Sequence, residues 1–271
     1  MADTLRFTVL GCGSSPGVPR IGGDWGACDP ANPKNRRSRC SLLAERLGAP
    51  GRTTRVLIDT SPDLRAQALA ADFGTLDGVL YTHAHADHIH GIDDLRGFVI
   101  NMRRRVEVYA DPQTMARLRE GFGYCFETPP GSEYPPILNG HLLAAGETVT
   151  IEGPGGPLTA LPINQIHGRI TSLAFRLGGL AYSPDVSDLD DEAEYRLQDL
   201  DVWIVDALRH SPHPSHLSLD EALGWIERLK PRRAILTHMH IDLDYEALRR
   251  SLPDHVQPAY DGMVIELPLG D

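Results

Sequence analysis

Residues 81–90 read Tyr81-Thr-His-Ala-His-Ala-Asp-His-Ile-His90, and this stretch decides the fold. It directly follows a short apolar run of the kind found in buried strands. His83 and His85 are two residues apart, so in an extended chain both side chains point the same way and can bind one ion. A turn after His85 would carry Asp87 and His88 to a neighbouring position, where a second ion can sit. The alternative, a solvated histidine-rich loop, is disfavoured because such loops rarely follow an apolar strand with ligand-type residues alone.

Three further metal ligands are expected, because a pair of ions needs more than four ligands. Imidazole with carboxylate suits Zn²⁺, Mn²⁺ or iron better than Ca²⁺ or Mg²⁺, which prefer oxygen ligands alone. The candidates stand in Pro162-Ile-Asn-Gln-Ile-His167, Leu180-Ala-Tyr-Ser-Pro-Asp185 and Arg233-Ala-Ile-Leu-Thr-His238. Each one alone could be a core histidine or a helix-capping aspartate. Their repeated placement at the ends of strands, where loops converge, points to one site.

Length and composition fit one globular domain over residues 1–271, with 41% hydrophobic and 23% charged residues. The first residues lack the apolar segment of a signal peptide, and no apolar run approaches the roughly 18–20 residues that cross a bilayer. Four cysteines without a paired spacing favour free thiols in a reducing compartment, so we expect a cytoplasmic protein without membrane association. The net charge of -11 argues against a long nucleic-acid surface.

Strand and helix patterns alternate through both halves of the chain. Strands are expected at residues 5–10, 40–45, 55–59, 79–82, 106–110, 147–151, 158–162, 172–177, 179–182, 202–206, 234–237 and 263–267. Helices are expected at residues 63–72, 92–103, 112–119, 190–198, 218–229 and 245–250, with Ser218 and Glu221 in a capping-box pattern. The Pro- and Gly-rich residues 128–136 are expected to form a surface insertion. Two strand-rich halves with flanking helices predict an α/β fold, a four-layer αββα sandwich with two sheets inside.

The ordered ligand set resembles the metallo-β-lactamase-fold superfamily over nearly the whole chain. The resemblance implies an αββα sandwich with two divalent metal ions, Mn²⁺ or Zn²⁺, at one edge of the sheets. It implies that one ion is bound by His83, His85 and His167 and the other by Asp87, His88 and His238, with Asp185 bridging them. We also count Asp87 among the expected catalytic residues. Lactamases that hydrolyse penicillin have a cysteine in the place of Asp185, so antibiotic hydrolysis is not expected.

Further segments are similar to the phosphoribosyl 1,2-cyclic phosphate phosphodiesterase family. They are Gly11-Cys-Gly-Ser-Ser-Pro-Gly-Val-Pro19, Asn35-Arg-Arg-Ser-Arg39, Leu57-Ile-Asp-Thr-Ser-Pro-Asp63, His90-Gly-Ile-Asp-Asp-Leu-Arg96 and Ser215-His-Leu-Ser-Leu-Asp-Glu-Ala222. That family hydrolyses small phosphodiesters and is similar to the tRNA 3′-processing endonucleases. Both use an additional histidine beside the metals, which His216 matches. One branch holds a structural zinc through a cysteine cluster, whereas Cys28 and Cys40 lack a clustered partner here and Ile241 stands where a histidine is expected.

The predicted function is metal-dependent hydrolysis of a small phosphorylated substrate, a cyclic phosphodiester such as a phosphoribosyl cyclic phosphate or a nucleotide. His216 would be the general acid, a role worth roughly 10²–10⁴ in rate. An RNA 3′-end endonuclease is an alternative that the net charge disfavours. A thioester or lactone hydrolase of the glyoxalase II type is another, against which His216 and its motif speak. A non-catalytic nucleotide- or phosphate-binding module is the third.

The sequence gives weaker support for a functional role of several other residues. Asp59 either orients a ligand histidine or caps a turn, and Asp206 is similar. Arg36 and Arg39 are candidate phosphate contacts. Three more histidines lie near the motifs and are expected at the surface: His90, His210 and His213. The family resemblance suggests a homodimer, with residues 92–103 as one surface that could support it.

Overall fold

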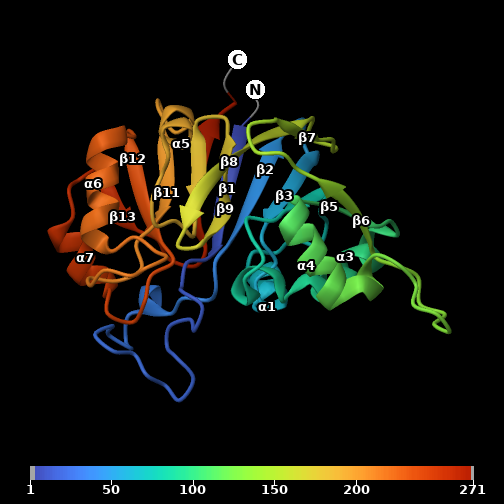
Figure 1. The fold of residues 1–271 in the computed structure, drawn as a ribbon, viewed down its shortest axis with the longest axis horizontal. Helices are drawn as coiled ribbons and strands as arrows, with labels where there is room; N and C mark the ends of the chain where they lie inside the picture. Colours follow the sequence, from blue (N-terminus) through green and yellow to red (C-terminus); the bar gives the residue numbers. More distant parts are fainter. Residues whose placement is uncertain (1–3, 270–271) are drawn as a thin grey trace.

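The computed structural model describes residues 4–269, which form two seven-stranded sheets packed face to face with helices on the outside (Figure 1). This arrangement confirms the predicted four-layer sandwich. The first and last strands, at the two ends of the chain, pair with each other in the same sheet. The sheets therefore close around a core to which both ends of the described chain contribute.

The first sheet has the strand order β14-β1-β2-β3-β4-β5-β6. Its strands β3 to β6 are parallel neighbours, and the other pairs are antiparallel. The bounds are β1 (Thr4–Gly11), β2 (Ser41–Leu47), β3 (Thr53–Ile58), β4 (Gly78–Leu80), β5 (Val106–Ala110), β6 (Leu138–Leu142) and β14 (Met263–Pro268).

The second sheet has the strand order β13-β12-β11-β10-β9-β8-β7. Its strands β10 to β13 are parallel neighbours, whereas β7, β8, β9 and β10 alternate in direction. The bounds are β7 (Val149–Ile151), β8 (Leu158–His167), β9 (Ile170–Leu177), β10 (Leu180–Ser183), β11 (Val202–Asp206), β12 (Arg233–Thr237) and β13 (Val256–Pro258).

Helices cover the outer faces of both sheets (Figure 1). Those of the first half are α1 (Leu64–Ala70), α2 (Ala86–Ile89), α3 (Leu95–Met102) and α4 (Pro112–Phe122). Those of the second half are α5 (Asp191–Arg196), α6 (Leu219–Leu229) and α7 (Tyr245–Ser251). Three 3₁₀ turns, η1 (Pro33–Asn35), η2 (Ile92–Asp94) and η3 (Gly123–Cys125), complete the helical elements of the described chain. Helix α6 begins with the predicted capping box between Ser218 and Glu221.

Alternation along the strands builds two apolar clusters from one sheet. In β3, Val56 and Ile58 face the second sheet, while Leu57 faces the helices on the outside. This is the period of two expected for a strand that is covered on both faces. In the second sheet Trp203 is fully buried, and its Nε1 donates to the Ser183 hydroxyl at 3.0 Å.

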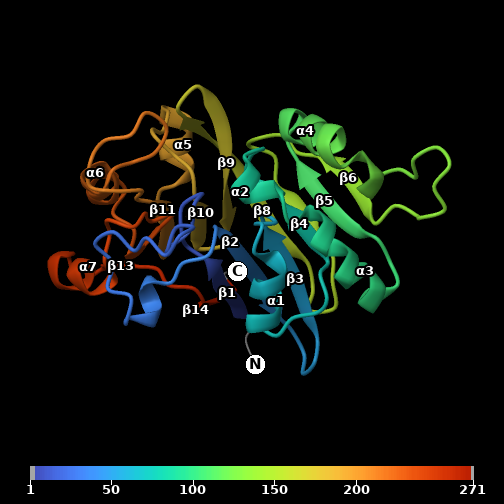
Figure 2. The same cartoon turned by 90° about the horizontal axis from the view of Figure 1, so that it is seen from below.

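The C-terminal ends of the parallel strands meet at one edge of the sandwich, which Figure 2 shows from below with α2 near its centre. Strands β3 and β4 run in parallel, as do β10, β11 and β12. Strand β8 is antiparallel to β9, which is antiparallel to β10, so β8 and β10 run the same way. Side chains that directly follow these strands are therefore brought together from both sheets.

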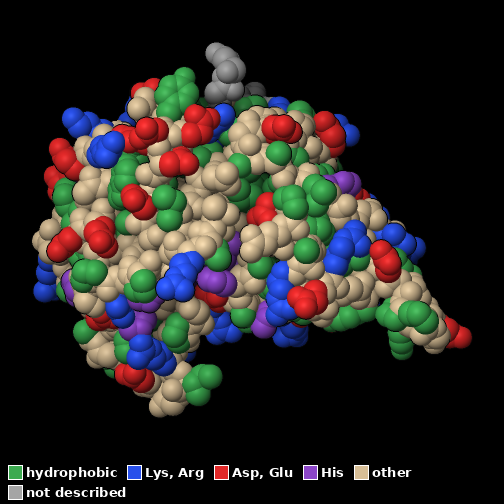
Figure 3. Space-filling model, viewed as in Figure 1, with side chains coloured by type: hydrophobic (Ala, Val, Ile, Leu, Met, Phe, Trp, Pro, Cys, Tyr) green, Lys and Arg blue, Asp and Glu red, His purple; other side chains and the backbone are tan. Residues whose placement is uncertain are grey.

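The surface differs between this edge and the rest of the molecule. On the face in Figure 3, most histidine side chains lie along the lower part, while acidic and basic side chains lie over both the upper and the lower parts. Within residues 4–269, no helix combines the length and apolar character needed to span a membrane.

Candidate metal centre

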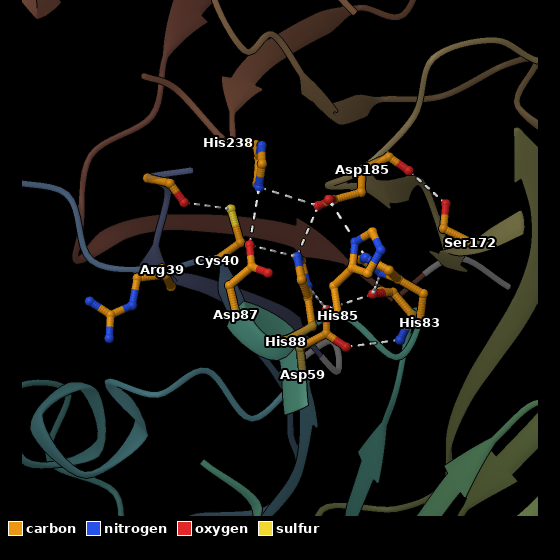
Figure 4. Close-up of polar contacts among 12 residues, drawn as sticks. Arg39, Cys40, Asp59, His83, His85, Asp87, His88, Ser172, Asp185 and His238 are labelled. Atoms are coloured by element: carbon orange, nitrogen blue, oxygen red, sulfur yellow. Dashed lines mark hydrogen bonds and ion pairs between the residues drawn. The ribbon is translucent and has the colours of Figure 1, made fainter. Parts of the chain in front are cut away.

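All seven predicted ligands lie together at the edge where the strand ends meet. Figure 4 labels all of them except His167. Their ligand atoms fall into overlapping groups whose members lie within 4.8 Å of one another. These groups are His83, His85, His167 and Asp185; Asp87, His88 and His238; and Asp185, His216 and His238. The first sheet supplies four of the side chains, and the second sheet supplies the rest.

The local backbone explains how four ligands fit into six residues. Strand β4 ends at Leu80, and His85 is still extended, with φ −70° and ψ 152°, as the N-cap of α2. Asp87 and His88 then lie in this short helix, which turns them away from the direction of His83. The predicted turn after His85 is thus the start of α2.

Asp185 lies between two groups of ligands, His83, His85 and His167 on one side and Asp87, His88 and His238 on the other. Its Oδ2 is 3.7 Å from His83 Nε2 and 3.6 Å from His167 Nε2. Its Oδ1 is 3.0 Å from His88 Nε2 and 3.6 Å from His238 Nε2. One carboxylate oxygen therefore faces each group, which is the arrangement of a bridging ligand.

The donor atoms at the centre fit divalent metal ions. His83 Nε2 is buried without a hydrogen-bond partner within residues 4–269, and the buried atoms His88 Nε2 and Asp185 Oδ1 lie 3.0 Å apart without forming a well-aligned hydrogen bond. Buried polar atoms without a partner are costly, and several that converge on common points indicate a ligand of their own. Imidazole nitrogen and carboxylate oxygen in this proportion suit Zn²⁺ or Mn²⁺.

Asp59 holds one of the ligand histidines in place. Its side chain is fully buried, and its Oδ2 accepts from His88 Nδ1 at 2.7 Å. The same carboxylate accepts from the backbone N–H and the hydroxyl of Thr82, both at 2.8 Å. Because Nδ1 of His88 is engaged in this way, Nε2 is the nitrogen that faces Asp185.

His167, a ligand histidine of the second sheet, is oriented by a backbone contact, whereas His238 Nδ1 has no hydrogen-bond partner within residues 4–269. His167 Nδ1 donates to the Ser215 carbonyl at 2.5 Å, which leaves Nε2 directed at Asp185. His238 follows β12 in the left-handed conformation, with φ +57°. Its Nδ1 is 3.8 Å from Asp206 Oδ1.

His216 lies beside the cluster in the position expected for an additional functional histidine. Its Nδ1 donates to Asp206 Oδ2 at 2.7 Å, and its Nε2 is 3.9 Å from Asp185 Oδ2. The ring stacks on that of His238, with centroids 4.6 Å apart and an interplanar angle of 10°. Asp206 is fully buried and also accepts from the Val186 backbone N–H at 3.1 Å. One aspartate therefore fixes the direction in which His216 points.

Burial and charge bias the protonation states at the site. Burial lowers the pKa of His167 to about 4 and lowers the pKa of His216. Burial opposes the ionisation of Asp185, but the imidazoles of His238, His88 and His83 hold its pKa well below the usual range. Burial would lower the pKa of His88, but the carboxylates of Asp185, Asp87 and Asp59 raise it well above its usual value, so this imidazole must give up its proton to bind a metal ion in the neutral form.

The loops next to His216 and His238 carry basic side chains. The Arg20 guanidinium contacts His240 Nε2, and His240 Nδ1 contacts Asp242. The His213 ring lies 5.1 Å from the His216 ring, centroid to centroid. Burial lowers the pKa of His213, and the neighbouring His216 and Arg209 lower it further.

Two arginines and two histidines with weaker support from the sequence lie outside the ligand groups. The Arg36 guanidinium lies 5.2 Å from the centre of a Trp25 ring, and Arg39 pairs with Asp63 at 3.0 Å. Figure 4 shows the Arg39 side chain pointing away from the histidines. Both arginines line a hollow of about 1000 Å³ on the outer side of β1, β2 and α1. The remaining two are exposed histidines, His90, whose ring lies 5.8 Å from that of Phe122, and His210.

Arg37 is an important residue that the sequence did not reveal. It is 1% exposed, and its guanidinium donates to the carbonyls of His240 at 3.2 Å and Leu243 at 2.6 Å. It thereby ties the segment between β1 and β2 to the loop that follows His238. Cys28 Sγ lies 3.9 Å from this guanidinium, whereas Cys40 contacts Gly13 and Thr237 instead.

Comparisons with known proteins identify the family of this chain. Residues 54–239 match the family model of the β-lactamase superfamily domain. An octanoyltransferase of Porphyromonas gingivalis (strain ATCC BAA-308 / W83) is 34% identical over 264 residues, which are 96% of this chain. The chain spans about half, 51%, of the length of that curated relative.

Two solved structures match this chain over nearly the whole length of both proteins. The crystal structure of a new diphosphatase from the PhnP family is 36% identical, with a TM-score of 0.88 and 99% of both chains covered. The metallo-β-lactamase fold protein YhfI from Bacillus subtilis is 20% identical, with a TM-score of 0.72 over 98% of this chain and 100% of that one, which shows the shared fold. The chain therefore belongs to the β-lactamase superfamily of metal-dependent hydrolases and, within it, to the PhnP family.

Proposed function

We propose that this protein hydrolyses small phosphodiesters with two divalent metal ions, Mn²⁺ or Zn²⁺. The observation that carries the proposal is the position of His216, which is fixed by Asp206 and directed at the carboxylate between the two ligand groups. Ester hydrolysis needs a proton donor for the departing oxygen, and this histidine is placed to be one.

Each ligand group would hold one ion. His83, His85 and His167 form the first set, and Asp87, His88 and His238 form the second, with Asp185 shared between them. When bound, the ions supply an activated water and stabilise negative charge on the phosphoryl oxygens. Asp87, in the second set, would also face the reacting phosphoryl group.

His216 and Asp206 would carry out the proton transfer. The Asp206 carboxylate accepts from Nδ1, so it stabilises the protonated ring and leaves the Nε2 proton for the departing oxygen. The stack on His238 restricts the ring further. This pair explains why a residue that is outside both ligand sets is held so firmly beside them.

Small substrates fit the chain better than polymers do. The net charge of -11 disfavours a long RNA, and the 36% identical relative is described as a diphosphatase of the PhnP family. A cyclic phosphodiester such as a phosphoribosyl cyclic phosphate, or a nucleotide, is the substrate class that we propose.

The test uses metal-stripped protein reloaded with Mn²⁺ or Zn²⁺ and assayed on bis(p-nitrophenyl) phosphate and a 2′,3′-cyclic nucleotide. We expect turnover that depends on metal and falls roughly 10²–10⁴-fold in His216→Ala, with metal content unchanged. His255→Ala, an exposed histidine before β13, is the matched control. Loss of metal from His216→Ala would make this residue a ligand, and silence on both esters in fully loaded protein would reject the proposal.

A second candidate is hydrolysis of an acyl thioester. The name of the curated relative, octanoyltransferase, favours it, although the chain matches only 51% of that protein. A metal ion that polarises a carbonyl oxygen and activates water would suit thioester hydrolysis as well. A thioester assay that outpaces both phosphate esters under the same conditions would decide for this candidate.

The proposal also covers the cellular compartment and the oligomeric state. The four cysteines are free and buried, which supports a reducing compartment such as the cytoplasm. Helix α3 exposes Ile100 at 69%, which makes it one surface on which a homodimer could form.

A further inference from the structure

The connection between β11 and α6 includes residues 208–217, which we call the histidine loop. It contains the proposed proton donor, His216, and also His213, to which neither the ligand sets nor the proposed proton transfer gives a role. The ends of the loop are joined, because the Leu208 N–H donates to the Leu217 carbonyl at 2.9 Å. The histidine loop is therefore a closed unit rather than an open connection.

Contacts within the loop fix the backbone around His213. The Arg209 guanidinium donates to the carbonyls of Ser211 at 3.1 Å and Pro212 at 2.8 Å. Prolines stand on both sides of the histidine, at Pro212 and Pro214, and the ring of each proline fixes its own φ near −65°. His213 is thus carried by a stretch of chain with little conformational freedom.

The loop rests directly on the turn that follows β8 and its metal ligand His167. At Gly168, where φ is +63°, an added Cβ would lie 2.8 Å from Ser215 Cβ and 3.3 Å from the Pro214 carbonyl oxygen. The Ser215 carbonyl accepts from His167 Nδ1 at 2.5 Å. Close approach at a glycine and this hydrogen bond together tie the histidine loop to the candidate metal centre.

The His213 ring lies beside the proposed proton donor. The centres of the His213 and His216 rings are 5.1 Å apart, and His216 Nε2 is 3.9 Å from Asp185 Oδ2. His216 is buried, whereas His213 is partly exposed. His213 is therefore the one of these two rings that is more open to a substrate, and it borders the place where the departing oxygen would receive its proton.

The hydrogen bonds of His213 leave it with one unused donor. The Ser215 N–H donates to His213 Nδ1 at 3.3 Å, and the Ser215 hydroxyl is also 3.3 Å from this nitrogen. A ring nitrogen that accepts a hydrogen bond has no proton, so the neutral ring has its proton on Nε2. Among residues 4–269, no hydrogen bond reaches this Nε2. The loop thus presents an oriented N–H group next to His216.

We propose that His213 sets the specificity for the departing part of the substrate by donating a hydrogen bond from Nε2 to a sugar oxygen. This inference rests on the proposed function and names the leaving group, a sugar such as the ribose of a cyclic nucleotide. A neutral N–H donor suits an uncharged hydroxyl or ring oxygen, and the guanidinium of the same loop, that of Arg209, is already engaged by two carbonyls. A nitrophenyl group has no such oxygen next to the departing one.

The test compares 2′,3′-cyclic AMP, whose departing oxygen belongs to ribose, with bis(p-nitrophenyl) phosphate in metal-loaded protein. His213→Asn removes the Nε2 donor but keeps an acceptor for the Ser215 N–H, because asparagine can accept from the backbone two residues on. We expect the ratio of kcat/KM for cyclic AMP to kcat/KM for the nitrophenyl ester to fall about three- to tenfold, which corresponds to one neutral hydrogen bond. Most of this loss should be in KM, because the contact is made in the bound substrate as well as in the transition state.

Two further variants serve as rescue and control. His213→Gln has an amide N–H near the position of Nε2 and should restore most of the ratio. His210→Asn changes an exposed histidine of the same loop and should leave the ratio as in the wild type. Turnover of the nitrophenyl ester by each variant shows that it is folded and loaded with metal.

The outcomes separate this inference from the proposed function. An unchanged ratio in His213→Asn, whether both rates fall equally or neither falls, would show that His213 does not contact the leaving group. A wild-type protein that hydrolyses the nitrophenyl ester but not cyclic AMP would exclude the sugar. Either result overturns the inference and leaves the phosphodiesterase intact, whereas no hydrolysis of either substrate by loaded wild-type protein would reject the proposed function and the inference with it.

Discussion

Asp59 shows how much of a metal site depends on residues that do not bind the metal. Sequence placed it at the end of a strand, with turn capping as an equal alternative. In the structure its backbone is in the left-handed conformation, φ +62°, and its carboxylate accepts from both Thr82 and His88. An aspartate tolerates this conformation better than most residues because its short polar side chain can hydrogen-bond locally. The orienting role is therefore the one that the geometry favours.

Replacing Asp59 tests that role. Asp59→Asn keeps the size of the side chain but weakens the acceptor for His88 Nδ1, so we expect metal affinity to fall about 10–100-fold. Competition with a chromophoric chelator measures the affinity directly. Asp63→Asn, which removes a carboxylate paired with Arg39 instead, is the control. Equal affinities in wild type and Asp59→Asn would show that His88 is held by its packing alone.

The elements that the sequence predicted are those with strong local patterns. Strand β3 alternates between two apolar faces, and α6 combines a capping box with an apolar stripe, so both were found. Helix α2 has four residues and is too short to show a period. The edge strand β6 contains Asn139, Gly140 and His141, and it is a strand because β5 supplies its hydrogen bonds. Such pairing is a tertiary property that local propensity does not contain.

Strand β8 shows why polar residues of the site made a strand hard to predict from the sequence. It was predicted to end at Pro162 but continues to His167, as the burial pattern alternates along its length. The buried positions near its end are Gln165 and His167, polar residues that face inward, so they break the apolar alternation that marks a strand. Arg37 was missed for a related reason, because its partners are carbonyls about 200 residues away. Ligand types and their spacing were visible in the sequence, whereas the residues that support them were not.

The capping box of α6 gives a pH-dependent prediction. Hydrogen bonds from the Ser218 hydroxyl and N–H lower the pKa of Glu221 below its usual value. A depressed folded-state pKa stabilises the fold above the ordinary pKa of about 4.3, and this stabilisation is lost as pH falls through the folded-state value. We expect Ser218→Ala to lower the free energy of unfolding by about 1 kcal/mol at pH 7 and by less at pH 4.

Urea unfolding of metal-stripped protein at the two pH values measures this difference without interference from the metal ligands. Asn32→Ala removes an N-cap whose side-chain amide does not titrate, on the 3₁₀ turn η1, where Asn32 Oδ1 accepts from the Lys34 N–H. Its effect should therefore depend less on pH between 4 and 7. A Ser218→Ala effect that is the same at both pH values would argue against the reciprocal pair.

The metal centre joins the two sheets of the whole molecule. His83, His85, Asp87 and His88 follow β4 in the first sheet, whereas His167, Asp185 and His238 come from the second. Ions that bind both groups would act as a link between the halves of the sandwich, and binding to the folded state alone adds about 4 kcal/mol when free metal is 1,000 times the Kd. We therefore expect a chelator to lower the Tm by about 10 °C and to keep a single transition, as scanning calorimetry can show. Asp185→Asn, which weakens the ligand shared by both groups, should make the Tm nearly independent of added metal. A wild-type Tm that does not respond to chelation would mean that the two sheets hold these seven side chains in place by packing alone.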